Sequence, residues 1–196
     1  MLLSIIPLKI SPVVKRLKHE ENVAIFVAIL IILAFVLFDK TTLQIHQNNL
    51  GTNIGQVAPN IPIKLVNGTN VTLNEFRGRP VVLWFITTGC SSCSQSSQLL
   101  KSQYYNQIHS KGAVILTVNL YDNLGTDGFS LKFFANSYGY GLNKTGWIYG
   151  TTTQNASYEY DPNAYLDIYY VINSNGTIIN EGSPLSTNLN SVVSSL

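Results

Sequence analysis

A run of six apolar residues, VVLWFI at positions 81–86, limits the folds open to this chain more than any other feature. The run is rich in β-branched and aromatic residues and does not alternate with polar ones. It therefore predicts a central strand that is buried on both faces. The run AVILTVNL at 113–120 predicts a second buried strand. Such strands need cover on both sides, which indicates a sheet between two layers of helices.

The segments around these strands predict a mixed sheet. IKLV and VTL are short strands joined by Asn-Gly at 67–68, a strong hairpin signal. Further strands are expected at 146–151, 168–173 and 177–182, and further helices after the cysteines, within 128–139, within 155–166 and at 186–196. The first helix carries an apolar stripe of Leu99, Leu100, Tyr104 and Ile108. Asp127 is expected to cap the second helix. The prediction is an α/β domain with a central mixed β-sheet flanked by helices on both faces.

The charges of this domain are balanced. Charged residues make up only 11% of the chain, and from residue 41 onward seven are basic and seven are acidic. A neutral surface has no electrostatic attraction for a phosphate backbone, so nucleic-acid binding is not expected.

The run VAIFVAILIILAFVLF at 23–38 contains sixteen apolar residues without interruption. As a helix it would extend about 24 Å, somewhat less than the roughly 30 Å hydrocarbon core, and the stems of Lys18 and Lys40 can cover the difference. A buried core helix is the alternative, but this helix would be apolar on every side. No Ala-x-Ala-like cleavage site follows, so a retained transmembrane helix is expected.

The predicted organisation follows from this span. Four basic residues precede it and only Lys40 lies close behind it, which places the amino end in the cytoplasm. Residues 1–21 are then a cytoplasmic tail, 22–40 a single-pass anchor in the cell membrane, 41–53 a tether, and 54–196 an extracytoplasmic domain. Asn-x-Ser/Thr sequons give weak support to this side of the membrane. They begin at Asn67, Asn70, Asn143, Asn155 and Asn175.

Cys90 and Cys93 are the only cysteines, and they stand where a buried strand gives way to a helix. Unpaired amides and the helix dipole at such a junction favour a thiolate at the first position. The spacing allows the second sulfur to resolve a mixed disulfide. We therefore expect Cys90 to attack and Cys93 to resolve.

A metal-binding site and a purely structural disulfide are the alternatives for this pair. Tetrahedral zinc takes about four ligands, and the histidines His19, His46 and His109 lie far from the cysteines in sequence. A bridge between residues three apart closes a very small loop and adds little stability, although an oxidising compartment would form it regardless of activity. No metal and no cofactor are expected.

GQVAPN, the Asn-Gly hairpin, LNEFRGRPVVLWF, Cys-x-x-Cys and YYVINSNGTI stand in this order over residues 54–182. In these features the chain resembles the thioredoxin-like superfamily. Within it, the chain is most similar to membrane-anchored thiol:disulfide oxidoreductases of the TlpA/ResA kind, with AhpC/TSA- and redoxin-like relatives. The resemblance implies a thioredoxin-like fold and disulfide exchange with protein cysteines outside the cytoplasm. It also implies an electron partner in the membrane or outside the cytoplasm.

The chain departs from this family near the cysteines. Gly89 stands where the family usually has tryptophan, and the intervening pair is Ser91-Ser92. Asp167 stands where the family has a cis-proline, in a loop that faces the cysteines. An aspartate there would relay protons or disfavour the nearby thiolate; the alternatives are a shifted alignment or a turn cap.

Three rival functions stay open. A peroxiredoxin-type peroxidase would fit Thr87, but Leu83 occupies the position of its proline and no arginine follows Arg79. A copper-delivery protein of the Sco kind would have cysteines four apart and a late histidine, whereas none follows His109. The third is an adhesive domain in which eleven tyrosines matter more than the thiols.

Overall fold

The computed structural model describes residues 25, 27–37 and 49–196. The chain divides into two units, Met1–Asn48 and Asn49–Leu196. Residues 27–37 are helical, and the helices of the described residues include none that is both long and apolar enough to cross a membrane. The predicted tail 1–21 and both ends of the predicted span lie outside the described residues, as do His19 and His46.

Residues 49–196 contain one mixed sheet of seven strands in the order β2-β1-β5-β4-β3-β6-β7. Strands β3, β4 and β5 are parallel to one another, and the other pairs are antiparallel. The strands are β1 (Pro62–Leu65), β2 (Asn70–Thr72), β3 (Val81–Ile86), β4 (Val114–Asn119), β5 (Trp147–Thr152), β6 (Ile168–Ile172) and β7 (Ile178–Gly182). The prediction of a mixed sheet is confirmed.

Strand β3 lies between β4 and β6, and all of its side chains are buried. Because successive side chains point to opposite faces, Val82, Trp84 and Ile86 enter one core, whereas Val81, Leu83 and Phe85 enter the other. This is why the sequence of β3 shows no polar alternation.

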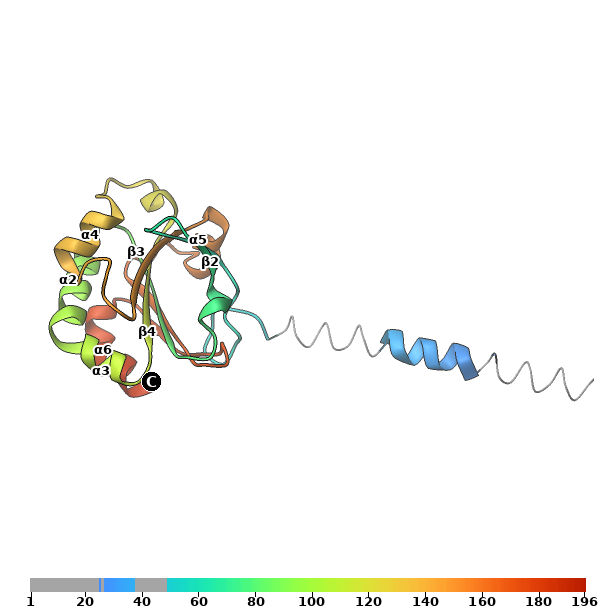
Figure 1. Cartoon of the computed structure of the whole chain (residues 1–196). Coiled ribbons are helices and arrows are strands. Elements are labelled where there is room, and N and C mark those ends of the chain that lie inside the picture. The colour runs from blue at the N-terminus through green and yellow to red at the C-terminus, as the bar shows by residue number, and fades with distance from the viewer. Residues whose placement is uncertain (1–24, 26, 38–48) are drawn as a thin grey trace, which may run out of the picture. The chain divides into compact units, whose positions relative to one another are not determined.

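Helices cover both faces of the sheet (Figure 1). One core receives side chains from α2 (Ser91–Leu99), α3 (Tyr105–Ser110), α4 (Leu131–Tyr138) and α6 (Leu185–Ser195). The other core receives them from α5 (Gln154–Tyr160) and the short 3₁₀ helix η1 (Leu73–Phe76). A second 3₁₀ segment, η3 (Tyr121–Gly125), follows β4.

The helix after the cysteines contains a π-helical segment, η2 (Leu100–Tyr104), between α2 and α3. Leu100 and Ile108 are buried as predicted, but Leu99 and Tyr104 are only partly buried. A π-type turn adds one residue to the helical repeat, so Tyr105 takes the inward position expected for Tyr104.

The predicted cap of α4 is wrong. The helix begins at Leu131, and the hydroxyl of Ser130 accepts the Phe133 amide at 3.2 Å. An N-cap residue directly precedes its helix. Ser130 holds that position and accepts the free amide of Phe133, whereas Asp127 lies three residues further upstream. Leu131, Phe134 and Ala135 are buried as expected.

The compact unit begins at Asn49, within the segment predicted as a tether. Leu50 forms a bridge with Val57, whose amide donates to the Asn49 carbonyl at 2.7 Å. Val57 in turn bridges to Thr177, the residue directly before β7. These backbone bonds attach residues 49–53 to the sheet domain.

Candidate active site

The turn from β3 into α2 ends at Cys90, with Cys93 in the first turn of the helix, and Thr88 fixes the path of this turn. The Thr88 amide donates to Asn123 Oδ1 at 3.0 Å, and its hydroxyl donates to the Phe129 carbonyl at 2.7 Å. The Cys90 amide donates to the Thr87 carbonyl at 3.2 Å. The turn is therefore tied to the loop that leads into α4.

Gly89 is required by this close approach. A Cβ atom at position 89 would lie 2.3 Å from the carbonyl oxygen of Asp127, a backbone atom that cannot swing away. Any larger residue would force the loop apart. This explains why position 89 lacks the tryptophan that is common in the family that the chain resembles.

Cys90 and Cys93 form a disulfide with a Cα–Cα distance of 5.3 Å. Cys90 is the N-cap of α2, and its sulfur accepts the Cys93 amide at 3.1 Å. The pair thus stands at a helix start, as the sequence predicted. Cys90 is 6% exposed and Cys93 is fully buried, so an incoming sulfur reaches Cys90 first.

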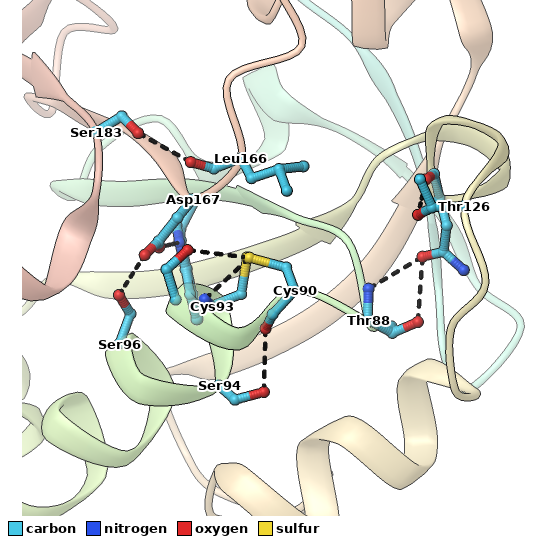
Figure 2. Close-up of a disulfide and its surroundings, with 12 residues drawn as sticks. Thr88, Cys90, Cys93, Ser94, Ser96, Thr126, Leu166, Asp167 and Ser183 are labelled. Carbon is cyan, nitrogen blue, oxygen red and sulfur yellow. Dashed lines mark hydrogen bonds between the residues drawn. A yellow bond between two sulfur atoms is a disulfide. The ribbon is translucent and has the colours of Figure 1, made fainter.

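Ser92 and Asp167 link the disulfide to the sheet, and Figure 2 shows Asp167 beside the two cysteines. The hydroxyl of Ser92 lies 3.1 Å from Cys90 Sγ. Asp167 is fully buried, and its two carboxylate oxygens accept hydrogen bonds from Trp84 Nε1 and from the Ser96 hydroxyl, each at 2.7 Å. The loop before β6 therefore places a carboxylate beside the helix that starts with the cysteines.

Burial raises the pKa of Asp167 above its usual range, and hydrogen bonds from Ser96, Trp84 and Ser92 oppose this rise. The residue has a φ of +66°, a left-handed conformation that aspartate tolerates better than most residues. A buried carboxyl group held beside a disulfide is suited to accept or donate a proton there.

The structure brings together Cys90, Cys93 and Asp167 but not the remaining candidate residues. The five sequon asparagines are all exposed. His109 is exposed on α3 and stacks on Tyr105. The described residues contain no group of three or more His, Cys, Asp or Glu side chains placed to hold a metal ion.

Sequence reasoning missed the two donors that hold Asp167. Trp84 was expected only as a core residue of β3, and its indole N–H needs an acceptor when buried. Ser96 lies in α2 among residues that otherwise read as polar surface, yet it is fully buried. The one sequence signal for this contact was Trp84 itself, because a buried indole N–H needs an acceptor and none stands near it in the sequence.

The AhpC/TSA family profile matches residues 54–180. The chain is 26% identical over 123 residues to thiol-disulfide oxidoreductase ResA of Bacillus subtilis (strain 168), covering 63% of this chain and 66% of ResA. It is 34% identical over 88 residues to the chloroplastic Peroxiredoxin Q of Triticum aestivum, covering 43% of this chain and 36% of that protein. The chain thus spans less than two thirds of either relative.

Solved structures share the fold. The thioredoxin domain of a thiol-disulfide oxidoreductase from Bacteroides vulgatus matches with a TM-score of 0.54 and 23% identity, covering 72% of this chain and 98% of that domain. A thioredoxin-like protein from Aeropyrum pernix matches with a TM-score of 0.53 and 18% identity, covering 69% and 88%. The thioredoxin-like fold and the resemblance to ResA-type proteins are confirmed. By its profile match, the chain belongs to the AhpC/TSA family.

Proposed function

We propose that this protein is a thiol:disulfide oxidoreductase that exchanges disulfides with protein cysteines outside the cytoplasm. One observation carries the proposal: Cys90 and Cys93 form a disulfide at the start of α2, where the Cys93 amide donates to the Cys90 sulfur. That amide and the helix dipole stabilise a thiolate at Cys90 when the pair is reduced.

The exchange balances in two steps. The Cys90 thiolate attacks one sulfur of a substrate disulfide, and the other substrate sulfur leaves as a thiolate. The Cys93 thiolate then attacks the Cys90 sulfur of the mixed disulfide and releases the second substrate sulfur. The Cys90–Cys93 bond forms, two electrons pass to the substrate, and both released thiolates take up a proton. The reverse sequence oxidises a dithiol.

Asp167 serves this chemistry as a proton carrier. Cys93 must lose a proton before it attacks, and it is fully buried. Asp167 has a raised pKa and is hydrogen-bonded to Ser96, on the same helix as Cys93. The Ser92 hydroxyl lies 3.1 Å from Cys90 Sγ and hydrogen-bonds the carboxylate, so it connects Asp167 to the sulfur that Cys93 attacks.

The similarity to ResA supports this function over the rivals. The similarity to Peroxiredoxin Q favours a peroxidase. However, no arginine follows Arg79 in the sequence to bind a peroxide. For copper delivery, the chain offers Cys-x-x-Cys with no histidine after His109. A dithiol at a helix start matches disulfide exchange more closely than either.

The test is a redox titration of the purified full-length chain. In glutathione buffers of stepped potential, alkylation followed by mass measurement is expected to give one two-electron transition for the Cys90–Cys93 pair. The chain is also expected to accelerate the reduction of insulin disulfides by dithiothreitol. A pair that stays oxidised at every potential, with no acceleration, contradicts the proposal.

A single membrane span at 22–40 belongs to the same proposal. The run 23–38 is uninterrupted apolar sequence. The large apolar side chains described within residues 25–37 are between 45% and 73% exposed. A helix so apolar and so exposed needs a nonpolar solvent. The excess of basic residues before it supports a topology with the sheet domain outside the cytoplasm.

Protease treatment of intact cells tests this topology. We expect an added protease to digest the domain 54–196 and to leave a short membrane-bound amino fragment. An epitope at the amino end is expected to stay protected until the membrane is opened. Protection of the domain in intact cells would show the opposite orientation, and release of the whole chain by alkaline carbonate would show that it is not anchored.

A further inference from the structure

A pocket of about 620 Å³ lies beside the loop that carries Asp167. Its walls come from the loop between α5 and β6, from the adjacent ends of β6 and β7, and from Thr52 and Asn53. This volume falls within the range of roughly 300–1,000 Å³ that is typical of ligand sites. Neither cysteine lines the pocket, so it has no part in the sulfur chemistry itself.

Asp161 brings to this pocket a carboxylate that lacks part of its hydrogen bonding. The side chain is only 2% exposed. Oδ1 accepts the Tyr165 amide at 2.6 Å, whereas the buried Oδ2 has no hydrogen-bond partner in the described part of the chain. A buried oxygen without a donor is costly, so this carboxylate brings an unsatisfied acceptor to the pocket wall.

Glu181 brings a second carboxylate to the same pocket. It lies on β7 directly opposite Tyr170 of β6. Burial raises the pKa of the Tyr170 phenol most, and the negative charges of Glu181 and Asp161 raise it further. Both carboxylates line the pocket, and Glu181 pairs with Tyr170 across the two strands. The lining residues, all within 49–196, include no lysine, arginine or histidine to neutralise them.

The other notable lining residues are aromatic. Tyr160, Tyr165 and Tyr170 all line the pocket, and Tyr165 is largely exposed at its edge. Aromatic faces attract cations, and two carboxylates without a counter-charge repel anions. The donor set is too small for a metal cage, because the described residues hold no cluster of three acidic, histidine or cysteine side chains. The carboxylates and tyrosines of the pocket therefore favour an organic cation that donates hydrogen bonds.

We infer that this pocket binds the ammonium or guanidinium group of a lysine or arginine side chain on the protein substrate. The pocket borders the loop that carries Asp167, and Asp167 hydrogen-bonds Ser96 on the helix that begins with the cysteines. Tyr165 and Ile168 line the pocket on either side of Leu166 and Asp167, and Ser183 both lines it and donates to the Leu166 carbonyl at 2.9 Å. A substrate that crosses this loop presents its cysteine to Cys90 and its cation to Asp161 and Glu181. The identity of the ligand as a substrate side chain rests on the proposed function.

Binding is tested first with probes that carry no sulfur. The full-length chain, labelled with ¹⁵N-tyrosine, is titrated with N-acetyl-lysine methylamide and with the norleucine counterpart, which lacks the ammonium group. The lysine probe is expected to shift the signals of Tyr165 and Tyr170 to saturation, and the norleucine probe to leave them in place. Equal shifts by both probes would overturn the proposal.

Variants then locate the site. Glu181→Gln, at a partly exposed strand position, is expected to weaken binding of the lysine probe at least tenfold, and Asp161→Asn to do the same while its oxygen still accepts the Tyr165 amide. Glu159→Gln, an exposed residue of α5 outside the pocket, is the charge-matched control and is expected to bind as the wild type does. Unchanged binding in Glu181→Gln would overturn the proposal.

Exchange kinetics separate this site from the redox function. Disulfide-linked peptides that carry lysine or norleucine near the cysteine are compared at low concentration. The wild type is expected to favour the lysine peptide in kcat/KM, and Glu181→Gln to lose that preference while retaining the rate for the norleucine peptide. Saturable binding of the lysine probe without exchange of either peptide would refute the redox function and leave the cation site intact.

Discussion

Replacing Cys90 with serine is expected to reduce disulfide exchange to the rate of the uncatalysed reaction between dithiothreitol and insulin. A serine hydroxyl at the N-cap retains the hydrogen bond to the helix amide, but it cannot form the sulfur–sulfur bond on which exchange depends. Cys90 is also the only one of the two sulfurs that an incoming disulfide can reach. The measurement is the rate of insulin reduction by the purified chain.

Replacing Cys93 with serine is expected to have a different outcome. Cys90 can still attack, but no second sulfur releases the product, so a covalent adduct of one substrate per chain accumulates. Mass measurement without reductant detects it, and added thiol removes it. Ser91→Ala is the matched control, because Ser91 is exposed between the cysteines, and it should retain the wild-type rate. Wild-type exchange by both cysteine variants would exclude this pair as the catalytic site.

The sheet could be predicted from the sequence because a strand that is buried on both faces is a continuous run of apolar residues. VVLWFI has no polar alternation, since alternate side chains of β3 enter two separate cores. The hairpin of β1 and β2 at one edge was predicted from the Asn-Gly turn at 67–68. The π-helical segment η2 left no such trace, because one extra residue in a turn depends on packing rather than on composition. For this reason Tyr104 packs against the core only in part, and Tyr105 takes the fully buried position.

The candidate site was predicted less completely than the fold. The cysteines are neighbours in sequence, so their place at a helix start followed from local pattern. The position of Asp167 beside that helix depends on β6 pairing with β3, a contact between segments about eighty residues apart. Its hydrogen bonds to Trp84 and Ser96 could not be foreseen without that pairing. The pocket of Asp161 and Glu181 depends likewise on the pairing of β6 with β7.

Replacing Asp167 with asparagine is expected to slow the second exchange step by on the order of a hundredfold near neutral pH, the usual scale for loss of a positioned acid or base. Asparagine keeps an oxygen to accept Trp84 Nε1, and Ser96 can turn its hydroxyl to accept from the new amide. The fold is therefore preserved while the proton acceptor is lost. Stopped-flow measurement of product release from a preformed mixed disulfide reports this step alone.

The pH profile distinguishes proton transfer from a purely structural role. In the wild type, the rate is expected to rise with pH as Asp167 ionises, at a pH above the usual range for aspartate because burial raises its pKa. The variant lacks this limb of the profile. Asp127→Asn, which removes an exposed carboxylate from the loop beside Gly89, is the control and should keep it. Equal pH profiles for Asp167→Asn and the wild type would refute the proton-carrier role.

Stability gives an independent measure of the same carboxyl group. A folded-state pKa above the unfolded value means that the folded protein holds the extra proton, so the contribution of Asp167 to stability is complete at low pH and is lost as pH rises through the raised pKa. Asp167→Asn has no such loss. Denaturant unfolding of the oxidised chain is therefore expected to show the variant gaining stability relative to the wild type as pH rises from about 4. Asp161 and Glu181 also have raised pKa values, and they titrate in both proteins. The difference between the stability curves of the variant and the wild type therefore isolates Asp167. A difference that does not change with pH would mean that the carboxyl group only anchors Trp84 and Ser96.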